Sequence, residues 1–245
     1  MSTVRPCILV SSCKRDQQNG ANTAVRNTWG VSSRIPYFFF IGDGAVSSRA
    51  DEIKLNVPDD YLSLTYKSKE SLAWAVRQGF THAFRAFTDT HLDVGRLAQS
   101  GFAQHDYVGN DAGLQSAGFQ FTHGGPGFWT GPRAINILLD SPILKEKYET
   151  DRYEDQWAGR VLYERGMVPF DDKRYSMGWS YGKDEPAVLE GNDTISEHLS
   201  SSQGQYFPDW MYAAHARRFG VPYTSKERRR KGCNCAHCRN QEENR

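Results

Sequence analysis

The sequence lacks a long hydrophobic run, and it has few cysteines and almost no net charge. Near the amino terminus the apolar run covers only residues 7–10, which is too short for a signal peptide or a membrane span. The sequence therefore predicts a cytosolic protein, unless a targeting segment has been removed. Five cysteines, two near the start and three near the end, do not form the pattern of a secreted disulfide framework, which favours reduced thiols.

The 245 residues fit one α/β domain with an appendage, which we divide at residues 1–204 and 205–245. Hydrophobic residues make up 38% of the chain and aromatic residues 13%, as in a globular protein. The net charge of +1 is unevenly spread, because from His215 onward nine Lys or Arg stand against three Glu. The basic end suggests a tail that docks on something anionic, and a solvated terminus is the alternative.

Strands alternate with helices along the first two thirds of the chain. Apolar runs predict strands over residues 7–12, 37–41 and 82–87, and helical spacing predicts helices over residues 22–29, 68–78, 132–139, 154–165 and 209–219. Residues 88–93 and 171–205 are interpreted as loops. This alternation predicts a mainly parallel sheet flanked by helices, with its ligand site at the carboxyl ends of the strands.

Asp89 and His91 follow the third predicted strand. Side chains two residues apart in an extended segment point the same way, so this pair could hold one cation. A carboxylate and an imidazole suit Mn²⁺ or a similar ion, which would neutralise charge on a diphosphate leaving group. A capped turn is the alternative interpretation.

Two further segments carry polar groups suited to sugar chemistry. Glu154 and Asp155 precede a helix, where a carboxylate could act as a general base or could merely favour the helix dipole. Glycines beside aromatic residues in segment 123–129 would allow close approach to a sugar, although a tight turn would have the same composition. His198, in a predicted loop, could complete a set of metal ligands.

Taken in order, these segments resemble the fringe and β-1,3-galactosyltransferase group, glycosyltransferase family 31. The similar stretches are Arg26-Asn27-Thr28-Trp29, residues 38–42, residues 60–68, the glycine segment 124–129 with Pro132-Arg133, Glu154-Asp155 with Gly159, and residues 195–198. They span about residues 7 to 200 in the family's order.

The resemblance implies a GT-A nucleotide-sugar transferase fold with a basic, Cys-rich C-terminal extension, a divalent cation (Mn²⁺ or Mg²⁺) and a UDP-sugar donor. It implies an inverting reaction with Asp155 as general base, and Asp89 and His198 as metal ligands. His91 joins them because Asp89-Thr90-His91 resembles the Asp-x-His motif of polypeptide N-acetylgalactosaminyltransferases. Donor-binding roles fall to Arg26, Trp29, Lys67, Thr88, Asp89, Gly125 and Glu154.

One departure from the family pattern leaves the donor sugar open. Where the family has three consecutive acids, this chain has Phe87-Thr88-Asp89, so only the last acid remains. An inactive transferase scaffold is therefore one alternative.

The tail adds a basic run from Lys226 to Lys231 and a compact cluster of Cys233, Cys235, His237 and Cys238. Thiolates and imidazole bind Zn²⁺, and the basic run could contact nucleic acid. The leading hypothesis is transfer to a glycan or glycoconjugate hydroxyl. The alternatives are a virus-encoded enzyme acting on hydroxymethylated DNA, and a nucleic-acid-binding zinc protein on an inactive scaffold.

Overall fold

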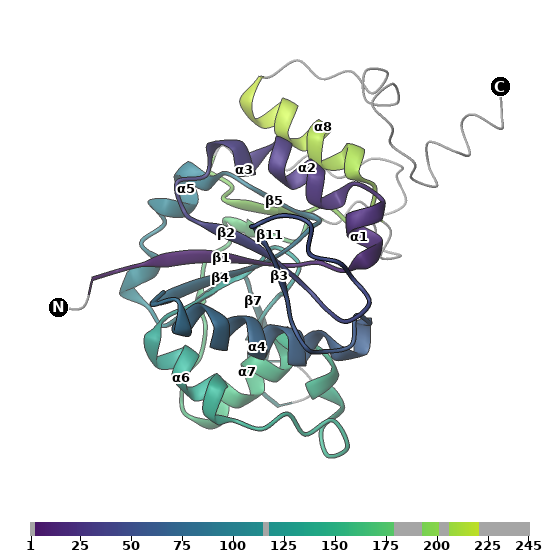
Figure 1. Cartoon of the computed structure of the whole chain (residues 1–245). Coiled ribbons are helices and arrows are strands. Elements are labelled where there is room, and N and C mark those ends of the chain that lie inside the picture. Colours follow the sequence, from purple (N-terminus) through teal and green to yellow (C-terminus); the bar gives the residue numbers. More distant parts are fainter. Residues whose placement is uncertain (1–2, 115–117, 179–192, 201–205, 221–245) are drawn as a thin grey trace.

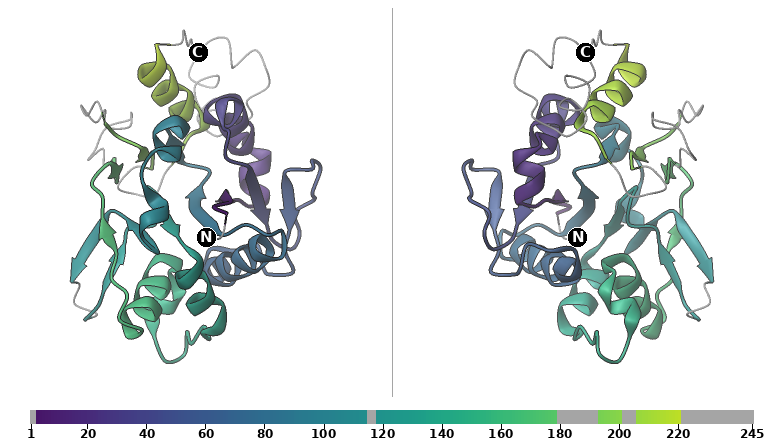
Figure 2. Two further views of the ribbon diagram at one scale, coloured as in Figure 1. Left: turned by 90° about the vertical axis from the view of Figure 1, so that its left-hand side faces the viewer. Right: turned by 90° about the vertical axis from the view of Figure 1, so that its right-hand side faces the viewer.

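A computed structural model describes residues 3–114, 118–178, 193–200 and 206–220 (Figure 1). Within these ranges, no helix is long and apolar enough to cross a membrane. The molecule is built around a seven-stranded sheet with helices on both faces (Figures 1 and 2).

The large sheet has the strand order β10-β6-β9-β4-β1-β2-β3. Its neighbouring strands pair in parallel except at β9, which runs antiparallel to both β4 and β6. The interior strand β1 is apolar along almost its whole length, and both of its faces are covered, as is usual in parallel sheets. The strand bounds are β1 Pro6–Ser11, β2 Tyr37–Ile41, β3 Glu52–Lys54, β4 His82–Phe87, β6 Tyr107–Gly109, β9 Phe128–Thr130 and β10 Phe170–Asp171.

One face of the sheet is covered by α4 (Leu64–Arg77), α6 (Pro132–Asp140) and α7 (Glu154–Glu164), which lie below it in Figure 1. These helices share an apolar core with the side chains that β1 and β2 direct to this face, among them Leu9 and Phe40. Pro132 begins α6 at a position where a missing N–H costs nothing.

The opposite face is covered by α1 (Lys14–Gln18), α2 (Ala21–Asn27), α3 (Trp29–Ser32), α5 (Val94–Ala98) and α8 (Pro208–Phe219). Figure 2 shows α8 beside α2 at this end of the molecule, where the Asn27 amide donates to the Tyr212 hydroxyl at 3.2 Å. Trp210 and Met211 of α8 belong to the same buried cluster as Ile8 and Val10 of β1. The last described helix is therefore packed into the domain core.

The described residues also form two small sheets and three short 3-10 helices. A three-stranded sheet has the order β11-β12-β5, and β7 forms a hairpin with β8. Their bounds are β5 Thr90–Leu92, β7 Asp111–Leu114, β8 Gln120–Thr122, β11 Tyr175–Ser176 and β12 Ser196–His198, with η1 Tyr61–Ser63, η2 Phe102–Gln104 and η3 Glu149–Arg152.

The architecture expected from the sequence is confirmed: a mixed α/β fold with a mainly parallel sheet flanked by helices. The predicted loops need correction, because residues 88–93 include β5 and residues 171–205 include β11, β12 and the last residue of β10. Strands of two or three residues give too short a pattern to detect in a sequence. The proposed boundary between residues 204 and 205 falls at the edge of a stretch outside the described residues and stays a prediction.

Candidate active site

A cleft of about 940 Å³ opens where the parallel strands β1 and β4 end. Ser11 of β1 lies beside Phe87 of β4 in the sheet, so the two strands end at the same edge. Polar residues follow both strands there. The ionisable residues along the cleft are mostly acidic: Asp16, Asp59, Asp60, Asp89, Glu154 and Asp155, against Arg15, Lys67 and His198. A cavity lined in this way suits a ligand that carries, or is accompanied by, a cation.

Asp89 and His198 face each other in this cleft. The His198 Nε2 atom lies 3.2 Å from Asp89 Oδ2, and the Ser200 hydroxyl donates to the same carboxylate oxygen. Burial opposes the charged form of each side chain, but their mutual attraction lowers the pKa of Asp89 and raises that of His198. The other oxygen, Asp89 Oδ1, is buried and has no hydrogen-bond partner among the described residues.

Two backbone features bring His198 to Asp89. Strand β12 pairs antiparallel with β5, so that His198 lies opposite Thr90, the residue after Asp89. A side chain on Gly125 would place its Cβ 2.6 Å from the His198 ring, and only glycine leaves room for the imidazole here.

Glu154 and Asp155, the first residues of α7, also line the cleft. Asp155 Oδ2 accepts from the Gly124 N–H at 2.9 Å, and Oδ1 accepts from the Gln156 N–H at 2.8 Å, which fixes the carboxylate. Burial raises the pKa of both acids, and for Glu154 the neighbouring charge of Asp155 adds to the effect. Such carboxylates take up protons more readily than exposed ones.

Lys67 and Thr88 lie at the cleft wall formed by the ends of β1, β2 and β4. The Lys67 ammonium donates to Asp59 Oδ1 and to the Ser12 carbonyl, both at 2.7 Å. Burial opposes ionisation of Asp59, but hydrogen bonds from Lys67 and from backbone N–H groups lower its pKa. The Thr88 hydroxyl donates to Asp16 Oδ2 at 2.9 Å.

No protein family and no curated protein matches this sequence. The fold, however, is shared with solved structures. A glycosyltransferase involved in the glycosylation of the major capsid of PBCV-1 aligns over 88% of this chain and 100% of its own length, at 11% identity and a TM-score of 0.52. The glycosyltransferase GlyE of Streptococcus pneumoniae aligns over 87% of this chain and 60% of its own, at 12% identity and a TM-score of 0.51.

The fold is that of the GT-A glycosyltransferases. Seven of the residues singled out in the sequence line the cleft of this GT-A domain: Lys67, Thr88, Asp89, Gly125, Glu154, Asp155 and His198.

His91 is not brought to the cleft. Its Nε2 atom lies 3.3 Å from Nδ1 of His215 on α8, and its Nδ1 atom lies 3.9 Å from Glu197. Burial and the nearby His215 lower the pKa of His91 to about 3. The alternation argument placed His91 beside Asp89, but Asp89 lies in a turn and His91 within β5, so the two side chains point apart.

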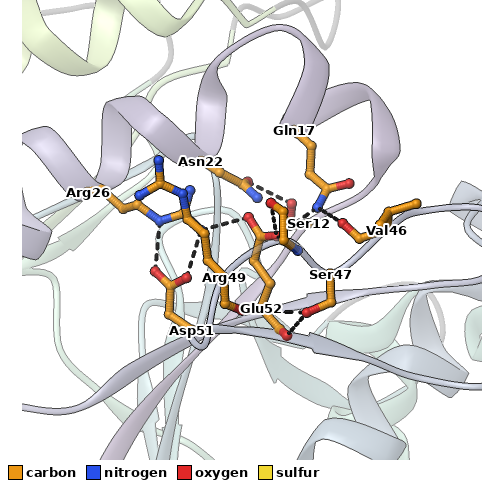
Figure 3. Close-up of polar contacts among 10 residues, drawn as sticks. Ser12, Gln17, Asn22, Arg26, Val46, Ser47, Arg49, Asp51 and Glu52 are labelled. Carbon is orange, nitrogen blue, oxygen red and sulfur yellow. Dashed lines mark hydrogen bonds and ion pairs between the residues drawn. The ribbon is translucent and has the colours of Figure 1, made fainter.

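Arg26 also lies away from the cleft, in a polar network between α2 and β3 (Figure 3). Its guanidinium donates two hydrogen bonds to Asp51, at 2.7 and 2.8 Å, and one to Glu52 at 2.7 Å. The same group lies 4.6 Å from the centre of the Phe39 ring. These contacts explain the position of the Arg26 side chain without a role in binding a nucleotide-sugar donor.

Trp29 is fully buried in the core, and its indole N–H donates to the Thr90 carbonyl at 3.0 Å. That bond ties α3 to the strand that follows Asp89. Trp29 therefore contacts the backbone behind the cleft and does not line it.

Several cleft residues escaped the sequence analysis. Asp16 and Asp59 line the cavity but belong to no motif that was recognised, and Tyr61 lies in the recognised stretch of residues 60–68 but was given no role in the site. Arg85 lies within β4 and is 3% exposed, and its Nη1 atom donates to the Ser11 hydroxyl. Its Nε and Nη2 atoms have no partner among the described residues, and its charge lies near Glu154 and Asp155. An arginine in an apolar strand gives no sequence signal for this placement.

Two predictions fall on residues that the structure does not describe. The possible zinc ligands Cys233, Cys235, His237 and Cys238, and the basic run Lys226 to Lys231, lie beyond residue 220. Among the described residues, no three His, Cys, Asp or Glu side chains form a group that could by itself hold a metal ion. Asp89 and His198 are two side chains of these types that lie together in the cleft.

Proposed function

We propose that this protein is a glycosyltransferase that moves a sugar from a nucleotide diphosphate donor to an acceptor hydroxyl, with a divalent cation as cofactor. The observation that carries the proposal is the cleft itself. In a GT-A fold, at the carboxyl ends of β1 and β4, the pair Asp89 and His198 lines the same cleft as the pair Glu154 and Asp155. Sugar transfer needs a positive charge that stabilises the departing diphosphate and a base that accepts the proton of the acceptor hydroxyl.

Asp89 and His198 would hold the cation. The buried Asp89 Oδ1 atom has no hydrogen-bond partner among the described residues, and a bound cation would provide one. A carboxylate oxygen and an imidazole nitrogen are ligands that suit Mn²⁺. When bound, the cation would stabilise negative charge on the departing diphosphate.

Asp155 would act as the general base of an inverting transfer. The acceptor oxygen forms a bond to the anomeric carbon while the bond from that carbon to the donor phosphate oxygen breaks, and Asp155 accepts the hydroxyl proton. The Gly124 and Gln156 N–H groups orient the carboxylate. Its raised pKa brings it nearer to neutral pH, where a base is most effective.

The donor would be a UDP-sugar, by analogy with the glycosyltransferase family 31 proteins that the sequence resembles. Lys67, Thr88, Gly125 and Glu154 line the cleft and are available to contact it. Arg26 and Trp29 would support the fold around the donor rather than bind it, since both lie outside the cleft.

The test is release of nucleoside diphosphate from UDP-glucose, UDP-galactose, UDP-N-acetylglucosamine, UDP-N-acetylgalactosamine and GDP-mannose, with Mn²⁺ or with EDTA. We expect Mn²⁺-dependent release from at least one UDP-sugar. Asp89→Asn should lower it at least about 100-fold, because the variant loses a charged ligand. Asp140→Asn, at an exposed position of α6, is the matched control. Release that EDTA and Asp89→Asn both leave unchanged would contradict the proposal.

A further inference from the structure

Two tyrosines stand exposed at the cleft. The Tyr61 side chain of η1 is 67% exposed and that of Tyr153, the residue before α7, is 40% exposed, yet both line the cavity. Their ring centres are 6.4 Å apart and the rings meet edge to face at 65°. Neighbouring Leu62 is 61% exposed. Large exposed apolar groups next to a cavity mark a ligand surface rather than a folding requirement.

Hydrogen bonds fix the backbone that carries both tyrosines, and the two rings contact each other. Asp60 Oδ1 accepts from the Ser63 N–H at 2.7 Å and so fixes the turn that carries Tyr61. The Tyr153 N–H donates to the Thr150 carbonyl at 3.1 Å, and the Tyr153 carbonyl accepts the first hydrogen bond of α7, from Trp157 at 2.8 Å. Preorganised aromatic rings lose little conformational entropy on binding.

The tyrosines are also close to the proposed base. Tyr153 directly precedes Glu154 and Asp155. Burial raises the pKa of Tyr61 to about 12, and the charges of these two acids add to the effect. A neutral phenol can donate a hydrogen bond to a ligand hydroxyl. A ligand on these rings would therefore lie near Asp155, in the same cleft as the proposed donor site.

Charge selects the class of ligand. Six carboxylate side chains line the cleft against the basic side chains of Arg15, Lys67 and His198. Lys67 is already paired with Asp59, and His198 with Asp89. Nucleic acid carries one negative charge per about 1.7 Å of duplex and would be repelled. The faces of a pyranose ring are apolar and pack on aromatic rings, and its hydroxyls bond to acids.

We propose that Tyr61 and Tyr153 form an acceptor subsite for a neutral saccharide. This proposal rests on the proposed sugar transfer and names its acceptor class. The transferred sugar would then be joined to a glycan hydroxyl held on the two rings, beside Asp155.

The test uses the full-length protein with Mn²⁺ and its best UDP-sugar. Lactose, N-acetyllactosamine and p-nitrophenyl β-glucoside are titrated as neutral acceptors, and a duplex with 5-hydroxymethylcytosine is titrated in parallel at about 0.15 M salt. We expect at least one saccharide to accelerate donor consumption and to appear as a product with the mass of one added sugar. Donor hydrolysis without acceptor is measured separately.

Tyr61→Ala and Tyr153→Ala should each raise the acceptor KM about 10-fold, because a stacked aromatic ring contributes about 1.4 kcal/mol. Donor hydrolysis should stay unchanged. Tyr61→Phe keeps the ring and should keep most of the affinity. Tyr163→Ala is the matched control, since Tyr163 is 39% exposed on α7 and does not line the cleft.

Three results would overturn the subsite: an acceptor KM unchanged in both alanine variants, no acceleration by any of the saccharides, or the hydroxymethylated duplex as the better acceptor. In each case unchanged donor hydrolysis would leave the proposed transferase function standing. Absence of donor hydrolysis in the wild-type protein would instead reject that function. The two failures are therefore distinguishable.

Discussion

Two polar clusters of this protein contain buried charges but differ in how fully those charges are paired. In the cluster around Arg26, both carboxylates are hydrogen-bonded (Figure 3). Glu52 accepts from Arg26, from Gln17 and from Ser48, and Asp51 accepts from Arg26 with both oxygens. In the cleft, by contrast, Asp89 Oδ1 has no partner among the described residues. Glu154 and Asp155 are neighbours whose negative charges repel each other, and among the described residues neither forms an ion pair with a basic side chain.

The difference separates structural from functional charge. A fully satisfied buried network stabilises one conformation, whereas an incompletely satisfied one costs stability and is retained where a ligand completes it. Arg26 and Asp155 were both assigned to the site from sequence motifs. Their surroundings distinguish them, and the following experiments test whether the distinction holds.

The largest effect is expected from Asp155→Asn. Loss of the base should lower kcat by about 10³-fold, within the usual range for general base catalysis. The free energy of unfolding should change by only about 1 kcal/mol, because the amide oxygen still accepts one of the two backbone hydrogen bonds. Steady-state kinetics and urea denaturation measure the two quantities. Glu164→Gln, at an exposed acid of the same helix, is the control, and a kcat within a few-fold of wild type for Asp155→Asn would remove Asp155 from the mechanism.

Arg26→Met should produce the opposite pattern. It leaves Asp51 and Glu52 without their cation, and breaking such a buried pair costs about 3–5 kcal/mol of unfolding free energy. The kcat of the folded protein should be retained. Arg26→Lys, which keeps the charge, guards against a variant that fails to fold. A normal unfolding free energy combined with a raised donor KM would return Arg26 to donor binding.

A smaller effect is expected from pH. The pKa values of Glu154 and Asp155 are raised in the folded protein, so the folded state binds protons more readily than the unfolded state. Their contribution to stability is present below the ordinary carboxyl pKa, about 4, and is lost as pH rises through the raised values. The kcat should change in the other direction and fall on acidification, because the base must be ionised.

Glu154→Gln isolates this pH effect. Near neutral pH the variant should be more stable than wild type by roughly 1 kcal/mol, and the gain should disappear below about pH 4. Urea denaturation curves recorded at several pH values from about 4 to neutral measure the free energy of unfolding of both proteins. A gain that is constant across the range would mean that the two carboxyls do not titrate as described.

The sequence predicted the fold well where patterns are long. The apolar runs of β1, β2 and β4 and the helical spacing of α6 and α7 are set by local sequence, and the parallel architecture follows from their alternation. The short strands β9 and β12 could not be found, because three residues carry no periodicity and their position depends on pairing with distant strands.

The candidate site was predictable only in part, for a related reason. Asp89, Asp155 and His198 were found because ordered motifs surround them. His91 was misplaced because the turn at Asp89 changes which way the next residues point. Asp16, Asp59 and Arg85 were missed because their importance comes from what folding places beside them, and no spacing in the chain records that.

The pairing of β12 with β5 has a consequence for how the protein is made. Ser200 and Asp89, which share a hydrogen bond, are 111 residues apart. At roughly 5–20 residues per second, the ribosome needs about 5–20 seconds to travel between them. For that interval the nascent chain carries Asp89 without His198, so the proposed cation site would be completed only late in translation.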